Sequence, residues 1–377
     1  MPCFRVALAG ALAFGAAFAA LAQPAPAPAI AAAAFLLLDF ASGQWIVAEN
    51  ADDRREPASL TKLMTAYLVF AALRDKAIAP AQMVTVSTAA WRAEGSRMFI
   101  DPKKAVTVDE LLRGMIVQSG NDASIALAEQ VAGSEGAFAE RMNTEAARLG
   151  LGGTHFANAT GISDPQHYST AADLARLAAA LIRDFPDYYP LYSLREYRYN
   201  SITQPNRNRL LWIDPYADGV KTGHTDAAGW CLIASAKRGE RRLLAVVLGA
   251  ASDAARTAEA QKLLNYGFQS FDTVLLYASD KPVTNLRVWK GETADVAAGF
   301  VADRYVTLPK GKGEKLALVM TATEPLVAPV TKDQRVGTVK VSLEGKPMAE
   351  FSLVALVEVP AANVFGRAWD TMRLWFK

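Results

Sequence analysis

The pattern of apolar and polar positions along the chain changes near residue 271. Over residues 31–270, apolar runs of strand length alternate with longer stretches in which apolar residues recur every three or four positions. After residue 271, short alternating runs replace them. A period of 3.6 predicts amphipathic helices, and a period of two predicts half-buried strands. The sequence therefore predicts a domain of helices and strands over 31–270 and a smaller all-β domain over 271–359.

The first domain is predicted to be of the α+β class, with helices packed on an antiparallel sheet. Thr107 and Glu110 form a capping box in front of one of the helices. Strands are predicted over residues 35–40, 45–48, 220–222, 229–236 and 241–249. Helices are predicted over residues 59–73, 107–118, 122–131, 133–149, 170–183 and 254–268. Strands, then many helices, then strands again is an order that favours helices on a central sheet.

The second domain is predicted to be a small β-sandwich. Turn-forming residues at 310–313 and 344–346 separate its short alternating runs. Strands are predicted over residues 286–289, 305–308, 316–321, 336–343 and 351–359. Several short strands with turns between them are typical of sandwiches. No candidate catalytic group falls in this part of the chain.

The N-terminal residues are predicted to direct export. Arg5 precedes an uninterrupted run of apolar and small residues, and Ala20-Leu21-Ala22 matches the A-x-A cleavage pattern. We therefore expect a signal peptide over 1–22, with a retained anchor as the alternative, and a Pro/Ala-rich linker over 23–30. Cleavage would leave Cys231 as the only cysteine, without a disulfide partner in the chain, and its apolar neighbours predict a buried thiol.

Residues 360–377 are predicted to form an amphipathic helix. Large apolar residues on one face and net positive charge on the other are typical of helices that lie in a membrane interface. The sequence therefore predicts an anchor on a membrane surface, with docking on the protein itself as the alternative. The apolar face holds Phe365, Trp369, Met372 and Phe376, and the opposite side holds Arg367, Asp370, Arg373 and Lys377.

Composition narrows the range of partners. Hydrophobic residues make up 51% of the chain and charged residues 21%, a balance typical of a globular protein. The formal net charge is only +2, so bulk charge gives no support for a nucleic-acid partner. The sequence has three dispersed histidines and no H-E-x-x-H, P-loop or dinucleotide-binding motif, so it indicates neither a metal nor a cofactor.

The first candidate chemistry lies at the predicted start of a helix, in Pro57-Ala58-Ser59-Leu60-Thr61-Lys62. Ser59 and Lys62 are three residues apart, so a helix places them on one face. A hydroxyl within reach of an amine is the minimum for a serine nucleophile with a lysine base. The pair alone is weak support, because S-x-x-K also occurs by chance as a cap followed by a surface lysine.

Two later motifs strengthen the hypothesis. Ser119-Gly120-Asn121 lies between two predicted helices, and Lys221-Thr222-Gly223 lies on a predicted strand. Each is common alone, as a turn and as a strand end. In this order after Ser59 and Lys62, they form the three-motif set of serine enzymes that react with β-lactams.

The chain resembles the serine penicillin-recognising enzymes, and among them the low-molecular-mass D-alanyl-D-alanine carboxypeptidases. The resemblance covers nearly the whole exported chain and rests also on the residues around the motifs: 54–62, 206–212 and 221–225. It implies a β-lactamase/transpeptidase-like domain followed by a β-sandwich and a C-terminal amphipathic helix. It also implies an exported enzyme in the periplasm, attached peripherally to the outer face of the inner membrane, that acts on peptidoglycan stem peptides and is acylated by β-lactams.

The resemblance also implies a role for each site residue. Ser59 is the expected nucleophile and Lys62 the base, whose pKa burial and the charge of Lys221 would lower. Ser119 would relay the proton to the leaving amine, and Asn121 would orient the substrate. Lys221, Thr222 and Arg207 would bind the terminal carboxylate of the substrate. Gly223 would let the substrate backbone approach the strand closely. The N–H groups of Ser59 and His224 would form the oxyanion hole.

The same motifs also fit other functions. A D,D-endopeptidase shares the same motifs. A class A β-lactamase shares them too, but the E-x-x-L-N stretch that would supply its glutamate is absent between the second and third motifs. A Ser-His-Asp hydrolase has no G-x-S-x-G motif here. A penicillin-recognising binding module or sensor would need neither Ser59 nor Lys62. The oligomeric state is not indicated.

Overall fold

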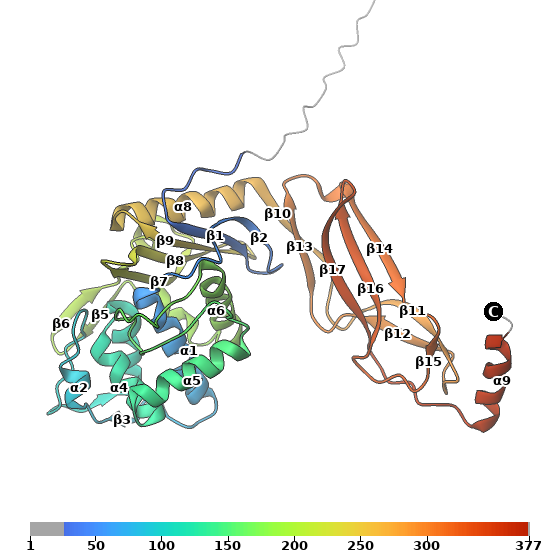
Figure 1. The fold of residues 1–377 in the computed structure, drawn as a ribbon, viewed down its shortest axis with the longest axis horizontal. Helices are drawn as coiled ribbons and strands as arrows, with labels where there is room; N and C mark the ends of the chain where they lie inside the picture. The colour runs from blue at the N-terminus through green and yellow to red at the C-terminus, as the bar shows by residue number, and fades with distance from the viewer. Residues whose placement is uncertain (1–25, 376–377) are drawn as a thin grey trace, which may run out of the picture.

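The computed structural model describes residues 26–375 and shows two domains side by side, with a separate helix at the far end of the second (Figure 1). The first domain contains helices and strands, and the second is built almost entirely of strands. The predicted α+β and all-β classes are therefore confirmed. The predicted signal peptide over 1–22, part of the predicted linker, and the last two residues lie outside the described residues.

A five-stranded antiparallel sheet forms the centre of the first domain. Its strand order is β2-β1-β9-β8-β7, so two strands from the start of the domain pair with three from its end. All five were predicted, and β7 forms one edge of the sheet. The strands are β1 (Ala34–Asp39), β2 (Trp45–Glu49), β7 (Ala217–Thr225), β8 (Gly229–Arg238) and β9 (Arg241–Ala250).

Neighbouring residues of the strands point to opposite faces of the sheet and build two apolar cores. Leu37 and Leu232 belong to the core beneath α8 (Asp253–Ser270). Leu36 and Ile233 belong to the core shared with α1 (Lys62–Arg74) and α6 (Ala171–Asp184). Because both faces of the sheet are buried, its strands appear in the sequence as apolar runs of strand length, from which they were predicted. Helix α1 lies inside the domain, since most of its side chains are buried.

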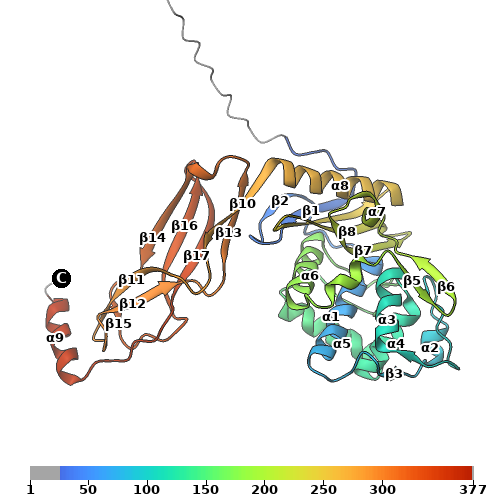
Figure 2. The same cartoon turned by 180° about the vertical axis from the view of Figure 1, so that it is seen from behind.

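Of the remaining helices of the first domain, α4 (Asn121–Ala132) and α5 (Glu135–Arg148) pack against α1, while α2 (Thr88–Trp91) and α3 (Val108–Arg113) pack against α4 (Figure 2). The predicted capping box is confirmed: Thr107 Oγ1 accepts from the N–H of Glu110, whose carboxylate accepts from the N–H of Thr107. After α3 the chain makes one π-helical turn, Gly114–Gln118, and stops at Ser119, which has a left-handed φ of 66°.

Several short elements were not predicted. The largest is the hairpin of β5 (Glu196–Tyr199) and β6 (Ile202–Pro205), most of whose residues are only partly buried or exposed. Because neither face of this hairpin is a buried apolar face, its sequence lacks a clear period-two pattern. The others are the strands β3 (Met83–Val84) and β4 (Val106–Thr107), the helices α2 and α7 (Leu210–Ile213), and the 3₁₀ helices Tyr189–Ser193 and Gly313–Lys315. The helix predicted over 59–73 begins as the 3₁₀ turn Ala58–Thr61 and continues as α1.

The second domain contains a two-stranded sheet, β10-β13, and a six-stranded sheet of order β14-β16-β17-β12-β11-β15. The predicted strand over 351–359 is shifted, because β17 begins at Lys346 directly after the turn and ends at Ala355. Strands β10, β12 and β15 were missed. The bounds are β10 (Phe271–Tyr277), β11 (Pro282–Trp289), β12 (Asp295–Gly299), β13 (Arg304–Pro309), β14 (Leu316–Ala322), β15 (Leu326–Val327), β16 (Arg335–Leu343) and β17 (Lys346–Ala355).

A polar joint links the two domains where β10 leaves α8. Asp39 at the end of β1 is fully buried and pairs with Arg241 at 3.0 Å. Thr273 of the second domain donates a hydrogen bond to the same carboxylate. The Ser42 hydroxyl lies 2.7 Å from that of Thr307. A buried carboxylate needs such partners, so the joint depends on groups from both domains.

The C-terminal helix α9 (Val364–Trp375) touches the second domain mainly through a polar contact: the Asp370 carboxylate accepts a 2.6 Å hydrogen bond from the N–H of Lys290. The apolar residues Phe365, Trp369 and Met372 are 87%, 60% and 56% exposed, so this face does not dock on the protein. Phe376 of the predicted face lies outside the described residues. Across residues 26–375, no helix is both long enough and apolar enough to span a membrane.

Candidate active site

Ser59 lies in a 3₁₀ turn, Ala58–Thr61, that leads directly into α1. In a 3₁₀ turn residues i and i+3 eclipse, so the side chain of Lys62 lies directly along the helix from Ser59. Ala58, the residue before the serine, has a left-handed φ of 47°. Strained backbone of this kind persists only where the surroundings impose it.

Two glycines allow other parts of the chain to pack closely against this turn. A Cβ on Gly161, which has a φ of +83°, would lie 1.8 Å from the backbone oxygen of Ala58. A Cβ on Gly223 of β7 would lie 3.0 Å from the backbone oxygen of Pro57 and 3.2 Å from the backbone nitrogen of Ser59. The serine turn is thus packed between a loop and the edge strand, and a larger residue at Gly161 cannot fit without moving it.

Lys62 is buried and has three acceptors around its amine. Nζ lies 3.1 Å from Oγ of Ser59, 2.7 Å from Oδ1 of Asn121 and 2.6 Å from the backbone oxygen of Thr160. A neutral amine has two N–H bonds and one lone pair. The oxygens of Asn121 and Thr160 can only accept, so they take the two N–H bonds, and the lone pair faces the Ser59 hydroxyl.

The surroundings also favour the neutral form. Burial, together with the positive charge of Arg207, lowers the pKa of Lys62 to about 7, while Asp122 and Glu135 act weakly in the opposite direction. The second charge is therefore Arg207, whereas the sequence pointed to Lys221. A lysine with a pKa near 7 exists in both protonation states at neutral pH, as a general base requires.

The second and third motifs meet each other at the side of the cavity. Nζ of Lys221 donates a 2.8 Å hydrogen bond to Oγ of Ser119 and a 3.0 Å bond to the backbone oxygen of Thr222. Burial, and then the charge of Lys62, hold the pKa of Lys221 well below its ordinary value. Lys221 lies behind Ser119 and does not line the cavity. Its amine therefore contacts the hydroxyl of Ser119 and not the cavity itself.

Asn121 and its neighbour Asp122 join the second motif to the loop that follows α2. The Asn121 amide donates to the backbone oxygen of Glu94 at 2.6 Å while its oxygen accepts from Lys62. The Asp122 carboxylate accepts from the backbone N–H groups of Met98, Phe99 and Ile100. A carboxylate with several backbone donors fixes a loop firmly. This carboxylate was not singled out in the sequence, because its partners lie more than twenty residues away.

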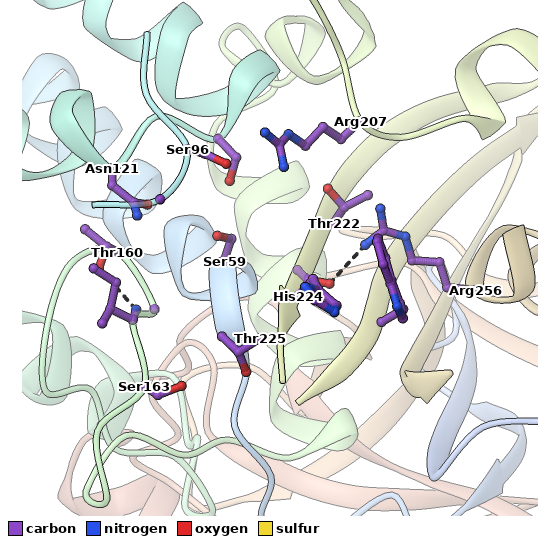
Figure 3. A pocket seen from close by; sticks show the side chains of 16 residues that line it. Ser59, Ser96, Asn121, Thr160, Ser163, Arg207, Thr222, His224, Thr225 and Arg256 are labelled. Carbon is purple, nitrogen blue, oxygen red and sulfur yellow. Dashed lines mark hydrogen bonds between the residues drawn. The ribbon is translucent and has the colours of Figure 1, made fainter. Parts of the chain in front are cut away.

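A cavity of about 520 Å³ opens above Ser59. In Figure 3, Asn121 and Thr160 lie on one side of the serine, and Thr222 and His224 lie on the other. Arg207 enters from above, at the end where Thr222 lies (Figure 3). Of the predicted residues, Ser59, Ser119, Asn121, Arg207, Thr222, Gly223 and His224 line this cavity, whereas Lys62 and Lys221 lie behind it.

Arg256 of α8 also lines the cavity and was missed in the sequence. Its guanidinium donates to the backbone oxygens of Gly223 and Cys231, pairs with Asp253, and lies 5.0 Å from the centre of the Trp230 ring. The arginine thus ties α8 to β7 and β8 beneath the cavity. The sequence offered no signal for it, since it lies in an ordinary helical stretch.

The histidines have partners other than Ser59, and Nδ1 of His155 lies 2.6 Å from the backbone oxygen of Gln166. Nε2 of His167 lies 2.8 Å from Oγ1 of Thr61, whose hydroxyl donates to the backbone oxygen of Ala58. Nδ1 of His167 accepts from the N–H of Ala157, so the ring is neutral with its proton on Nε2. Burial lowers the pKa of His167 to about 4. His224 packs on Trp230, with ring centres 4.1 Å apart.

At the other end of the cavity, two lining hydroxyls share a carboxylate that lies behind them. Oε2 of Glu56 accepts hydrogen bonds from Oγ of Ser163 at 2.7 Å and Oγ1 of Thr225 at 3.0 Å. Both hydroxyl residues line the cavity, on its two opposite walls (Figure 3). Within residues 26–375, no group of three or more His, Cys, Asp and Glu side chains is placed to hold a metal ion.

Two family models of known proteins match this chain. The family model described as D-alanyl-D-alanine carboxypeptidase, peptidase S11, matches residues 21–252. A second model, described as the C-terminal domain of penicillin-binding protein 5, matches residues 271–361. The two matches cover both domains of the described chain.

Individual relatives match over most of their length. The D-alanyl-D-alanine carboxypeptidase DacC of Escherichia coli (strain K12) is 43% identical over 368 residues, which are 96% of this chain and 92% of that protein. The structure of penicillin binding protein 5 from Haemophilus influenzae has a TM-score of 0.85 at 40% identity, covering 88% of this chain and 98% of that chain. Penicillin-binding protein D2 from Listeria monocytogenes in its ampicillin-bound form has a TM-score of 0.60 at 30% identity, covering 65% of this chain and all of that one (100%).

Proposed function

The chain belongs to the D-alanyl-D-alanine carboxypeptidase family of serine peptidases, and we propose that it removes the terminal D-alanine of peptidoglycan stem pentapeptides through an acyl-enzyme on Ser59. The observation that carries this assignment is the amine of Lys62, 3.1 Å from Oγ of Ser59, with its pKa lowered to about 7.

Acylation begins with proton transfer from the Ser59 hydroxyl to the neutral amine of Lys62. Oγ then attacks the carbonyl carbon of the penultimate D-alanine and forms a tetrahedral intermediate. The N–H groups of Ser59 and His224 would hold the oxyanion, since Gly223 brings β7 close to the serine turn. The sequence resemblance suggested these donors, and the close approach at Gly223 supports them.

Departure of D-alanine requires a proton on its nitrogen. The Ser119 hydroxyl, hydrogen-bonded to Lys221, is placed to deliver its proton to this nitrogen, and it takes up in turn the proton that Lys62 accepted from Ser59, so that Lys62 is neutral again. The C–N bond then breaks, the ester on Ser59 forms, and D-alanine leaves. Water attacks the ester with Lys62 again as base, which releases the shortened peptide and restores the Ser59 hydroxyl.

Recognition of the terminal carboxylate falls to Arg207 and Thr222, which line the cavity at one end. An arginine paired with a carboxylate gives a charge-assisted hydrogen bond. Lys221, which lies behind Ser119, would act on this carboxylate only through the Ser119 hydroxyl. A β-lactam carries a carboxylate and a reactive amide in the same relation, so we propose that β-lactams acylate Ser59; the ampicillin-bound Listeria relative supports this.

We further propose that the enzyme works outside the cytoplasmic membrane and is attached to its outer face by α9. The predicted signal peptide and the substrate class support export. The exposed face of Phe365, Trp369 and Met372 supports attachment, because a helix with aromatic residues on one face partitions into a membrane interface.

Labelling by a fluorescent penicillin tests the assignment. The wild-type enzyme is expected to be labelled and to release D-alanine, and Ser59→Ala is expected to do neither. Ser134→Ala, which alters a helix cap outside the cavity, serves as the matched control and should label normally. Equal labelling of wild type and Ser59→Ala, or D-alanine release by Ser59→Ala, would contradict the proposal.

A further inference from the structure

Strand β7 offers the substrate a free edge. It is the last strand in the order β2-β1-β9-β8-β7, so only β8 pairs with it. The close approach of Gly223 to the serine turn shows that β7 runs beside Ser59. An edge strand presents unpaired N–H and C=O groups, and an extended peptide can bind there as an added strand.

The position of the terminal carboxylate determines in which direction such a peptide runs along β7. With the terminal carboxylate at Arg207 and Thr222, the rest of the chain has to run along β7 towards Thr225, antiparallel to the strand. A strand advances about 3.3 Å per residue, so Thr222 and Thr225 are about 10 Å apart. The acyl D-alanine then lies near Gly223, and the residue that precedes it reaches the level of His224 and Thr225.

Glu56 lies at this level of the groove. It accepts from the hydroxyls of Ser163 and Thr225, which come from opposite walls. The residue is partly exposed, and its second oxygen, Oε1, has no hydrogen-bond partner in the described part of the chain. Glu56 also makes no ion pair with any residue of 26–375. A carboxylate between two walls of the groove is thus available to a cation.

The groove is therefore electrically polar along its length. Arg207 lines the end that receives the carboxylate and brings a positive charge there. At the opposite end, the Glu56 carboxylate lies behind the hydroxyls of Ser163 and Thr225. A peptide with a terminal carboxylate and a positive charge on the residue preceding the acyl D-alanine matches both ends, because each of its charges then meets the opposite charge.

We propose that Glu56, held by Ser163 and Thr225, is a specificity-determining residue that binds the ammonium group of a diamino acid side chain immediately before the acyl D-alanine. This inference rests on the proposed function and names the stem peptides that the site prefers. The ammonium donates to the free oxygen of Glu56 in a charge-assisted hydrogen bond. Peptides with a neutral side chain at this position lose that bond.

The test compares two peptides that differ only in this charge: Nα-acetyl-L-Lys-D-Ala-D-Ala, with a free side-chain amine, and the same peptide with the amine acetylated. Wild-type enzyme is expected to show a kcat/KM about tenfold higher for the free amine, carried mainly by KM. In Glu56→Gln, which keeps an acceptor oxygen for the two hydroxyls but loses the charge, the ratio is expected to fall to about one. Asp226→Asn, which removes an exposed carboxylate on the turn after β7, is the matched control and should keep the wild-type ratio.

Each other result overturns the inference. A ratio near one in wild type excludes an ammonium subsite even without a variant. An equal loss on both peptides in Glu56→Gln assigns the residue a structural role alone, and a collapse of the ratio in Asp226→Asn assigns the preference to diffuse surface charge. Failure of the proposed function looks different, since neither peptide would then release D-alanine and penicillin would not label Ser59.

Discussion

Nζ of Lys62 donates a 2.6 Å hydrogen bond to the backbone oxygen of Thr160, a residue 98 positions further along the chain. With Asn121 as the second acceptor, this bond fixes both N–H directions of the neutral amine. The remaining lone pair faces Ser59. The loop around residue 160 thereby decides the orientation of a base that sits on α1.

The pKa of Lys62 predicts how acylation depends on pH. The amine acts as a base only when it is neutral, and its pKa is about 7. The second-order rate of acylation by a fluorescent penicillin should therefore fall about tenfold per pH unit below pH 7 and level off above about pH 8. Lys62→Arg, which stays protonated, should lose at least about 100-fold in acylation. A flat profile between pH 5.5 and 8.5 would exclude Lys62 as the titrating base.

Arg207 should matter most for substrates that end in a free carboxylate. Arg207→Gln is expected to weaken kcat/KM for acid-terminated peptides by about 1.5–3 kcal/mol, the usual worth of a hydrogen bond to a charged group. The matched peptide with a C-terminal amide should lose much less. Loss of the Arg207 charge also raises the pKa of Lys62, so the inflection of the acylation profile should move to higher pH. Equal losses on acid and amide would show that Arg207 does not bind the carboxylate.

Because of His167, the free energy of unfolding should decrease in acid. Burial lowers its pKa from 6.5 to about 4, so the folded state disfavours the protonated ring. The stabilising effect is present above pH 6.5 and is lost as the pH falls from 6.5 through about 4, amounting to about 3 kcal/mol at most. His167→Gln should be less stable at neutral pH but should depend less on pH over this range. Scanning calorimetry from pH 4 to 8 measures both, and parallel curves for the two proteins would contradict the prediction.

Gly161 predicts a steric coupling between its loop and the nucleophile. A Cβ at this position would meet the backbone oxygen of Ala58 at 1.8 Å, so Gly161→Ala should displace the serine turn and lower acylation about 10-fold or more as well as stability. Gly133 has the same left-handed φ, +82°, but open space around it. Gly133→Ala should cost only about 1 kcal/mol of stability and leave acylation unchanged. Similar acylation in the two variants would show that the contact at Ala58 is not coupled to the site.

Removal of residues 361–377 should separate activity from membrane attachment. The truncated enzyme is expected to hydrolyse soluble peptides at the wild-type rate, because α9 lies at the far end of the second domain (Figure 1). Its sedimentation with phospholipid vesicles should be lost, and Trp369→Ser, which removes one aromatic side chain from the exposed face, should weaken it partially. Unchanged sedimentation of the truncated protein would contradict attachment through α9.

The parts of the site that could be predicted are those encoded locally. Ser59 and Lys62 are three residues apart on one turn, and Thr107 and Glu110 form a capping box within four residues, so sequence spacing alone indicated both. The strands of the central sheet were also predictable, because a strand with both faces buried appears as a continuous apolar run; Leu36 and Leu37 of β1 lie in different cores.

The parts that could not be predicted depend on distant segments. Thr160 contributes a backbone oxygen, which any residue carries, so no side-chain pattern marks it. Arg256 and Glu56 acquire their roles only when α8 and the turn before α1 pack against β7. For the same reason the sequence pointed to Lys221 as the charge that lowers the pKa of Lys62, while Arg207 takes that part.

The joint of Asp39, Arg241 and Thr273 has a consequence for where the enzyme can work. These groups tie the two domains together, and α9 lies at the opposite end of the second domain. The length of the second domain therefore sets the distance between α9 and the active-site groove. With the helix resting on a lipid surface, the groove at Ser59 stands at a set height above it. The enzyme would then reach stem peptides at a certain distance from the membrane, whatever their chemistry. A longer second domain would move this distance further from the membrane.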